Sequence, residues 1–477
     1  MQVKIKPYEH QQRAFDFVLE TFKKSSGVAI LADMGVGKSL ITVAVVGHLA
    51  EQNKIRKMLI VAPLSVCGVW KEEFSKFANF DYHLRILKGS TNKKSETLRS
   101  FHGEELQIAV VNYESVWRLE RQIKSWNPDL IVCDESHKIK SHKITASKSL
   151  HKLALNTNYK LILTGTMITN KALDCFSQYK FLNPSIFGNS FYSFRNRYFD
   201  MVGYGGYTPV LKKTMEPELK EKIHSIAFRA TKAECLDLPE TQEINRFIEL
   251  EPSAIEIYKN LVKDSFAELS KGEVTTTNVL TKILRLSQLT GGFIGNDDGT
   301  AVQISTAKLQ ALEDIIESVL ESAGSSGGSK KLVVIAKFIP EIKAICKLLE
   351  KKKVRFSLIS GEVKNRAEEI EKFQNDPEVK VFVGQIATAG LGITLTVAST
   401  MVFYSLDYSM SNFEQCKARI HRAGQKENCT YIYLIAKGTV DEKVLKALGS
   451  KLNLAKSLID DYLRGKNPFQ NEGGENT

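Results

Sequence analysis

The chain has 477 residues, of which 43% are hydrophobic, and this ordinary composition excludes a wholly disordered protein. At roughly 100–200 residues per domain, the length accommodates two to four domains. No apolar run approaches the ~18–20 residues of a membrane helix, the first ten residues lack a signal-peptide core, and the seven cysteines include no C-x-x-C pair. We therefore expect a soluble, reduced, cytoplasmic protein without a membrane partner. The net charge of +12 suits a polyanion such as nucleic acid, although a merely basic surface is the alternative.

Apolar runs rich in Val, Ile and Leu alternate with helical patterns through the first 165 residues. The runs cover residues 28–32, 58–62, 108–112, 129–135 and 159–166, and residues 39–52 have a helical pattern. Uninterrupted runs of this kind are typical of strands buried on both faces of a parallel sheet. The pattern predicts an α/β lobe with a doubly wound parallel sheet, in a first domain of residues 1–235.

The remainder of the chain predicts helical insertions followed by a second α/β lobe. Residues 170–230 read as a helical insertion with a loop or hairpin at 199–210, and residues 236–300 as a helical linker. The second lobe is expected over residues 301–465, with a flexible Gly/Ser loop at 323–329 before its first strand. Its strands are predicted at residues 331–338, 355–361, 380–385, 400–406 and 430–436. The tail, residues 466–477, is expected to be disordered.

The segment LADMGVGKS (31–39) follows a predicted strand and opens a predicted helix. Gly35 and Gly37, with Val36 between them, allow backbone N–H groups to turn toward phosphate oxygens. Lys38 offers a charge to the β- and γ-phosphates, and Ser39 offers a hydroxyl to Mg²⁺. A glycine-rich turn with a solvated lysine is the alternative, but the strand–loop–helix context favours an ATP site.

Two carboxylates, Asp134 and Glu135, end the apolar run of DLIVCDESHKIK (129–140). Open α/β sheets bind ligands at this end of their strands. We expect Asp134 to hold Mg²⁺, usually through water, and Glu135 to orient and deprotonate the attacking water. An acidic strand end with a capping role is the alternative, and the nearby phosphate loop disfavours it.

A third pattern, SNFEQCKARIHRAGQ (411–425), is expected on a helix of the second lobe. The i, i+4, i+7 spacing of Gln415, Arg419 and Arg422 would place them on one face. Paired arginines beside a polyphosphate can stabilise the charge on the transferring phosphoryl group, and a solvated basic face is the alternative. A site assembled from two lobes can close with ATP and open after hydrolysis.

These blocks, in this order, resemble helicase superfamily two and, within it, the Swi/Snf branch of double-stranded DNA translocases. The branch resemblance rests on DESHKIK (134–140), FLNPSIFG (181–188), RATKAECLDLP (229–239), LRLSQLTGGF (284–293) and HRAGQ (421–425). It implies two RecA-like lobes and ATP hydrolysis with Mg²⁺ in an interlobe cleft. The hydrolysis would drive translocation on duplex DNA in repair, recombination, replication or protein displacement.

The resemblance also assigns roles to matching positions. Gln11 would read adenine, and Gly392 would lie beside the nucleotide. Coupling of the ATP state to DNA contact would fall to His137, Thr164, Gly165, Thr166, Gly390 and Thr394. Sequence-independent, salt-sensitive contacts with DNA would come from Pro63, Ser65, Asn112, Tyr113, Lys138, Ser360, Gly361 and Thr388, with Lys140 as an addition. Ordinary loop chemistry is the alternative for each of these contacts.

Two other functions compete with a duplex translocase. A strand-separating DNA or RNA helicase would share the ATP site, but the only candidate strand-splitting hairpin is GYGGY (203–207). A nucleotide-sensing scaffold without turnover should lack a catalytic group, whereas Lys38, Glu135, Arg419 and Arg422 are all present. We expect a monomeric motor of bacterial or viral type that depends on a separate targeting protein, because no accessory module fits in the chain.

Overall fold

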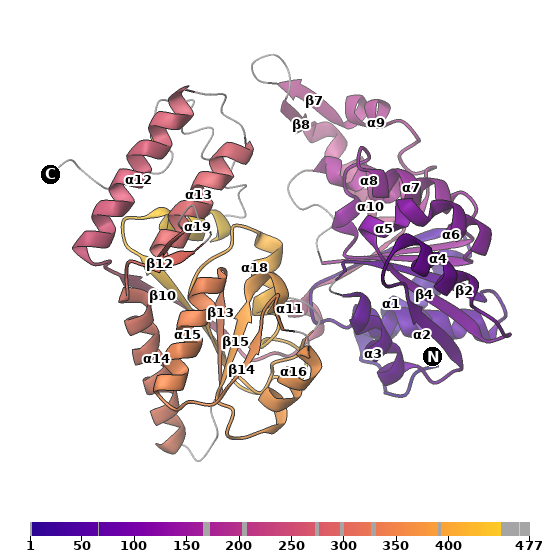
Figure 1. The fold of residues 1–477 in the computed structure, drawn as a ribbon. Coiled ribbons are helices and arrows are strands. Elements are labelled where there is room, and N and C mark those ends of the chain that lie inside the picture. Colours follow the sequence, from indigo (N-terminus) through magenta and orange to yellow (C-terminus); the bar gives the residue numbers. More distant parts are fainter. Residues whose placement is uncertain are drawn as a thin grey trace. The chain divides into compact units, whose positions relative to one another are not determined.

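The computed structural model describes residues 2–64, 66–165, 172–202, 208–271, 276–295, 300–325, 331–363, 365–389, 393–449 and 467. The chain divides into two compact units, Met1–Asp237 (unit 1) and Leu238–Thr477 (unit 2). Each unit contains one large parallel sheet with helices on both of its faces (Figure 1). The predicted α/β class with two parallel-sheet lobes is therefore confirmed.

Unit 1 is built on a seven-stranded sheet in the order β3-β4-β2-β5-β6-β1-β9. Every neighbouring pair in it is parallel. The strands are β1 (Gly27–Ala32), β2 (Lys57–Ala62), β3 (Tyr82–Ile86), β4 (Leu106–Asn112), β5 (Leu130–Asp134), β6 (Tyr159–Thr164) and β9 (Ala227–Ala230). Because β5, β6 and β1 are neighbours, their carboxyl ends lie side by side at one edge of the sheet.

Two sets of helices cover the faces of this sheet. One face packs against α1 (Glu9–Phe22), α2 (Lys38–Glu51) and α3 (Cys67–Phe77). The opposite face packs against α4 (Thr91–Arg99), α5 (Tyr113–Val116), α6 (Glu120–Trp126), α7 (Thr145–Ala154), α8 (Cys175–Leu182) and α10 (Glu216–His224). Beyond them, α9 (Phe191–Tyr198) and the antiparallel hairpin of β7 (Phe199–Val202) and β8 (Thr208–Leu211) extend away from the sheet (Figure 1).

Unit 2 is built on a six-stranded parallel sheet in the order β10-β17-β16-β13-β15-β14. The strands are β10 (Thr241–Ile248), β13 (Leu332–Ala336), β14 (Phe356–Ile359), β15 (Val381–Gln385), β16 (Thr400–Phe403) and β17 (Cys429–Ala436). One face packs against α14 (Ala307–Ser325) and α15 (Ile339–Lys351). The other face packs against α12 (Pro252–Lys271), α13 (Thr276–Thr290), α16 (Arg366–Asn375), α17 (Ile386–Ala389), α18 (Met410–Lys417) and α19 (Val440–Gly449).

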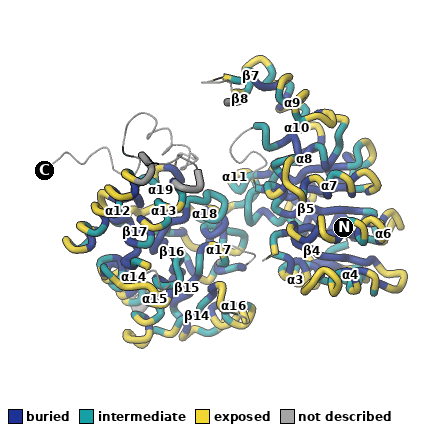
Figure 2. The backbone as a smooth tube through the Cα atoms, turned by 45° about the horizontal axis from the view of Figure 1, so that its top comes forward, coloured by how far each residue is buried: buried dark blue, intermediate teal, exposed yellow. Residues whose placement is uncertain are grey.

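Burial on both sides explains why the strands lack a polar alternation. Val28 and Ile30 of β1 pack on the side of α1 and α2, whereas Ala29 between them packs on the opposite side. Figure 2 shows the central strands of both sheets buried, while the outward sides of α4, α14 and α15 are exposed. Five of the seven cysteines, all free thiols, are buried, as expected for packing residues.

Three strands of the two large sheets differ from the sequence prediction. The edge strand β10 falls in the range expected to be a helical linker, and β9 falls in the range expected to be a helical insertion. Only Ile248 of the eight residues in β10 is buried, so this strand has no apolar run that could reveal it. The third, β3, has no buried residue at all. The tip of the 199–210 hairpin and the tail, except residue 467, lie outside the described residues.

A buried ion pair connects four elements of unit 2. Lys308 Nζ of α14 lies 2.6 Å from Asp441 Oδ2 of α19, and their side chains are 2% and 7% exposed. Asp441 also accepts hydrogen bonds from Thr290 Oγ1 at 2.8 Å and from the backbone N–H of Ala436 at 3.1 Å. Lys308 Nζ donates as well to the carbonyl oxygen of Tyr404. Every charge in this group is therefore compensated.

We expect Lys308→Met to lower the free energy of unfolding by about 3–5 kcal/mol, because it leaves the Asp441 carboxylate buried without its counter-ion. Urea denaturation followed by circular dichroism measures this change. Lys352→Met is the matched control, since Lys352 pairs with Glu317 on the surface and should cost at most about 1 kcal/mol. Equal losses in the two variants would contradict the argument.

Candidate nucleotide-binding site

The loop between β1 and α2 has a backbone that glycine adopts most readily. Gly35 and Gly37 have φ angles of 89° and 95°, and Gly37 is the N-cap of α2. A Cβ atom at Gly37 would lie 2.2 Å from Gln11 Nε2, so a side chain there would displace the Gln11 amide, and the positive φ angle strains it as well. The first N–H groups of a helix have no intrahelical partner, and together with the helix dipole they favour an anion.

Lys38 begins α2 and extends back over the loop. Its Nζ donates to the carbonyl oxygens of Ala32, at 2.7 Å, and Asp33, at 3.4 Å. Its positive charge is also one of the influences that lower the pKa of Asp134. The half-buried Ser39 follows it in the first turn. A cation, a hydroxyl and a helix N-terminus thus occupy one loop, as the sequence predicts for a phosphate site.

Helix α1 contributes two buried side chains to the same loop. Gln11 Nε2 donates to the carbonyl oxygen of Val36 at 3.1 Å, and its Oε1 accepts the backbone N–H of Tyr8 at 2.9 Å. His10 Nε2 lies 2.9 Å from the same Val36 oxygen. The structure therefore places Gln11 against the phosphate loop, while its contact with adenine stays a prediction.

Asp134 ends β5 and is held by three groups. The indole N–H of Trp70, on α3, donates to Asp134 Oδ2 at 3.0 Å, and the backbone N–H of Glu135 donates to Oδ1 at 2.9 Å. Tyr113 Oη donates to the Asp134 carbonyl oxygen at 2.7 Å. Burial, followed by the charge of Glu135, raises the pKa of Asp134, whereas the Lys38 charge and the two bonds to its carboxylate lower it. The bonds fix the carboxylate in place and favour its charged form.

Glu135 has an unusual backbone for a residue with a side chain. Its φ of 50° and ψ of 54° are left-handed, and the residue separates β5 from the short helix η2 (Ser136–Ile139). A left-handed residue other than glycine costs on the order of 1–3 kcal/mol and often marks a functional site. Its carboxylate Oε2 lies 3.3 Å from His137 Nδ1. The tight turn therefore brings the predicted water-activating and coupling side chains into contact.

The predicted coupling residues that follow β6 lie at the same edge of the sheet. Thr164 is fully buried, and a Cβ atom at Gly165 would lie 3.6 Å from the carbonyl oxygen of Ala32. Gly165 therefore lies beside the phosphate loop, whereas Thr166 lies outside the described residues. The blocks beginning at residues 31, 134 and 164 converge because β1, β5 and β6 are adjacent.

The donor set at this edge fits a magnesium nucleotide. The part of the chain that the structure describes contains no cluster of three His, Cys, Asp or Glu side chains able to hold a metal. A phosphate-loop site needs no such cluster, because Mg²⁺ takes most of its ligands from phosphates and water. Ser39 and Asp134 supply the hydroxyl and the carboxylate that such a site requires.

The predicted arginine face in unit 2 has a different geometry from the one expected. Helix α18 ends at Lys417, so Arg419 and Arg422 lie in the turns that follow, and the prediction of one helical face is wrong. They nevertheless converge, because Nη1 of each arginine lies 3.3 Å from the carbonyl oxygen of Ile393. Arg419 Nε also donates to the carbonyl oxygen of Gln415, which brings all three predicted residues together.

Gln425 holds these turns and was not among the predicted site residues. Its buried amide Nε2 donates to the carbonyl oxygens of Ala398 and Ile420 at 2.9 and 3.0 Å. Its Oε1 accepts the backbone N–H groups of Lys426 and Glu427. Its place in the HRAGQ block is the one signal in the sequence. Trp70 was missed as well, because nothing in its local sequence marks it as a partner of Asp134.

The predicted DNA-contacting residues divide by exposure. Lys138 and Gly361 are exposed, and Pro63, Lys140 and Thr388 are half-buried. Ser360 and Asn112 are buried, and the Asn112 side chain bonds to Glu114 and Ser115. Ser65, Gly390 and Gly392 lie outside the described residues, while the carbonyl oxygen of Thr394 accepts a bond from Gln374.

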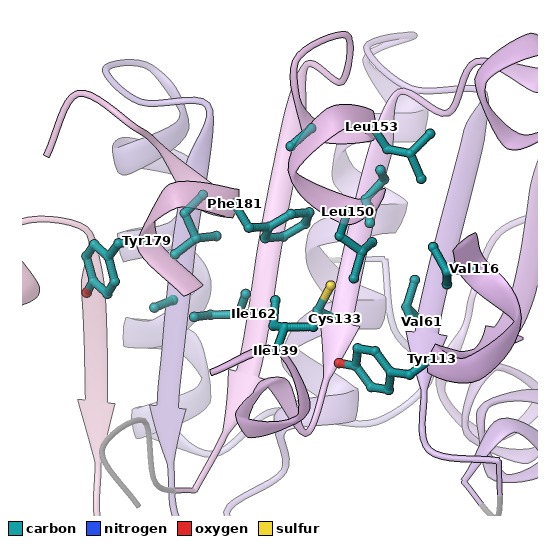
Figure 3. Packing of buried hydrophobic residues seen from close by; sticks show 14 of the residues in the cluster. Val61, Tyr113, Val116, Cys133, Ile139, Leu150, Leu153, Ile162, Tyr179 and Phe181 are labelled. Carbon is teal, nitrogen blue, oxygen red and sulfur yellow. The ribbon is translucent and has the colours of Figure 1, made fainter. Parts of the chain in front are cut away.

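Among the residues predicted to contact DNA, Tyr113 has the side chain whose surroundings differ most clearly from that prediction. It is 3% exposed and packs beneath the Asp134 strand, where Figure 3 shows it beside Val61, Val116 and Cys133. Its hydroxyl already donates to the Asp134 carbonyl oxygen. The structure therefore gives its side chain a supporting role at the nucleotide site instead of a contact with a phosphate.

Comparison with known families accounts for most of the chain. Residues 10–291, more than half of it, match the SNF2-related domain, and residues 307–424 match the helicase conserved C-terminal domain. The chain belongs to the SNF2-related family. The predicted Swi/Snf resemblance is thus confirmed.

Relatives and solved structures of the SNF2-related chain come from varied organisms. The DNA repair and recombination protein RDH54 of Saccharomyces cerevisiae (strain JAY291) is 27% identical over 93% of this chain and 52% of its own length. The RAD54-like repair and recombination protein of Drosophila pseudoobscura is 25% identical over 95% and 63%. An uncharacterized ATP-dependent helicase of Mycoplasma genitalium is 27% identical over 91% and 40%. This chain therefore spans 40–63% of the length of these three relatives.

The Sulfolobus solfataricus SWI2/SNF2 ATPase core in complex with dsDNA is 28% identical, with a TM-score of 0.47, over 98% of this chain and 95% of that one.

Replacing Trp70 by Phe removes the indole donor and keeps most of the packing. We expect about tenfold weaker apparent affinity for Mg²⁺ in ATP turnover, as for other groups that orient a ligand without touching the metal. Because the lost bond favours the charged carboxylate, the pKa of Asp134 should rise further and the acid limb of the pH–rate profile should move to higher pH. A magnesium titration of turnover at several pH values measures both effects, with Trp117→Phe at an exposed tryptophan as control. An unshifted acid limb would contradict this role of Trp70.

Replacing Tyr113 by Phe tests its revised role. The change leaves the buried Asp134 carbonyl without its donor, which costs about 1–3 kcal/mol. We expect lower thermal stability and lower turnover at saturating DNA, with the dissociation constant for DNA unchanged. The exposed Lys138→Gln, by contrast, should weaken DNA binding. Weaker DNA binding by Tyr113→Phe at full stability would restore the original prediction.

Proposed function

We propose that this chain is a DNA-dependent ATPase that translocates along double-stranded DNA. The observation that carries the proposal is the convergence of the phosphate loop, the Asp134–Glu135 pair and Gly165 at neighbouring strand ends in an SNF2-related chain. A phosphate loop beside two carboxylates is the arrangement that hydrolyses a nucleoside triphosphate. ATP is the proposed substrate.

Each residue at the unit 1 site then has a proposed role. Gly35, Gly37 and the start of α2 hold the phosphates through backbone N–H groups, and Lys38 neutralises their charge. When bound through Ser39 and Asp134, Mg²⁺ supplies charge neutralisation at the β- and γ-phosphates. Glu135 accepts a proton from the attacking water, and His137, 3.3 Å away, restrains its carboxylate.

Arg419 and Arg422 are the proposed stabilisers of charge on the transferring phosphoryl group. They belong to unit 2, so their role requires that they reach the phosphates at some stage of the cycle. Their shared bond to the Ile393 carbonyl holds both guanidinium groups in one place, which supports a joint action. Because Ile393 adjoins the proposed coupling residue Thr394, movement of this segment would link the arginines to the DNA contacts.

Duplex DNA is the proposed partner, and DNA repair or recombination the proposed setting. The net charge of +12 and the exposed Lys138 support a polyanion, and the names of the yeast and fly relatives support the setting. A separate targeting protein and a monomeric motor remain part of the proposal. No helix in the described ranges has both the length and the hydropathy needed to cross a membrane.

Steady-state ATP hydrolysis tests the proposal directly. We expect strong stimulation by duplex DNA, fading as salt rises, and little stimulation by single-stranded DNA or RNA. Glu135→Gln should reduce turnover at least a hundredfold while ATP binding persists. Arg419→Lys and Arg422→Lys should each cost about 10³-fold or more, because lysine cannot reproduce the planar, forked donor.

Distinct outcomes separate the competing functions. Stimulation by single strands or RNA, together with release of a labelled strand from a forked duplex, would indicate a helicase. Binding of ATP without turnover under any condition would indicate a scaffold. Turnover by Glu135→Gln equal to that of the unchanged protein would trace the activity to a contaminant.

A further inference from the structure

The positive charge of this chain is concentrated in one segment. From Ser136 to Phe199 there are ten lysines and arginines but a single carboxylate, Asp174. This segment of 64 residues therefore carries a net +9, out of +12 for the whole chain. It includes α7, α8 and α9, most of which lie outside the motif blocks described above. A uniformly basic surface would not produce this distribution.

The fold brings several of these cations around one imidazole. The ring of His142 stacks on Phe191 at the start of α9, with centroids 4.1 Å apart. Burial, and then the charges of Lys143, Lys180 and Lys148, lower the pKa of His142. These lysines come from the turn before α7, from α8 and from α7, which are neighbouring elements. The ammonium groups are therefore gathered in space as well as in sequence.

These cations differ from their neighbours in having no counter-ion. Lys140 pairs with Asp174, Lys152 with Glu120 and Arg197 with Glu218. Among the residues that the structure describes, no carboxylate forms an ion pair with Lys143, Lys148, Lys180 or Arg195. Lys180 Nζ instead donates to a carbonyl oxygen, that of Asn189, at 2.8 Å. Among the described residues, no carboxylate therefore compensates their mutual repulsion.

An exposed aromatic ring borders the cations. The guanidinium of Arg195 lies 5.3 Å from the ring centre of Tyr192, which is 61% exposed. Lys143 and Lys148 are also exposed. Unpaired cations spread over three helices suit a ligand with repeated negative charges better than a single small anion. A sugar–phosphate backbone has this charge pattern, and a neighbouring tyrosine can contact sugar or base.

We propose that Lys143, Lys148, Lys180 and Arg195, here called the α7–α9 basic face, bind the phosphate backbone of nucleic acid. The face is a contact additional to the predicted motif residues, none of which it includes. It rests on the proposed function only for the choice of duplex DNA as the first probe. Since no group of the face belongs to the nucleotide site, it contributes to affinity and residence on DNA and leaves the rate of hydrolysis on bound DNA unchanged.

Fluorescence anisotropy with the full chain and a labelled duplex, without ATP, tests this face. In Lys143→Gln/Lys148→Gln/Lys180→Gln we expect about tenfold weaker binding at low salt. The slope of log Kd against log salt should fall by about 2–3, since each phosphate contact with duplex DNA contributes about 0.9. ATP turnover at saturating duplex should stay at the level of the unchanged protein. Single-stranded DNA and RNA of equal length show whether the face prefers one backbone.

The matched control removes the same charge from the opposite side of the unit 1 sheet. Lys24, Lys54 and Lys71 are exposed and lie after α1, after α2 and on α3. Equal loss of affinity and slope in Lys24→Gln/Lys54→Gln/Lys71→Gln would attribute the effect to net charge and overturn the proposal. A changed turnover at saturating duplex, with Kd and slope unchanged, would overturn it too.

If the triple variant folds poorly, the double variant Lys143→Gln/Lys148→Gln takes its place, because it keeps the Lys180 bond to Asn189. It should give about two-thirds of the slope change.

Discussion

The buried carboxylate of Asp134 is the constraint around which unit 1 is organised. Burying a carboxylate at the end of a strand costs free energy unless hydrogen-bond donors and cations compensate its charge. Here Trp70 on α3, the Glu135 N–H and the Lys38 charge supply part of that compensation, although burial still raises the pKa of Asp134. Trp70 therefore connects α3, and the Glu135 N–H connects the turn after β5, to the same carboxylate.

Much of this arrangement follows from sequence because parallel strands have their own signature. The apolar runs at 28–32, 129–135 and 159–166 correspond to β1, β5 and β6, whose adjacency brings three motif blocks together. Three of the four edge strands of these sheets, β3, β9 and β10, lack this signature. In β10, Ile248 alone is buried, so the sequence of this strand resembles a polar segment. Only its pairing with β17 makes it a strand. Pairing between residues far apart in the chain is not encoded in local periodicity.

The site residues also divide into those set by local sequence and those set by contacts between distant parts of the chain. The turn at Gly35 and Gly37 and the start of α2 at Lys38 could be predicted because they depend on a few adjacent backbone angles. The helical spacing of Arg419 and Arg422 failed because α18 stops at Lys417, and Gln425 holds the turns instead by bonds to distant carbonyl groups. Tyr113 was misjudged for a related reason: its position in the motif is clear, but the burial of its side chain depends on β5 and on the helices packed over it.

The uneven charge of the chain has a consequence for how a complex begins. Outside Ser136–Phe199 the remaining residues carry only +3 of the total charge, so most of the net positive charge lies in one segment of unit 1. The field of a polyanion turns such a protein during diffusion, so that the positively charged segment faces the polyanion when the two first collide. Association then becomes faster than random tumbling allows, by an amount that falls as ions screen the field. The segment Ser136–Phe199 would therefore orient the protein before the predicted DNA-contacting residues outside it make contact.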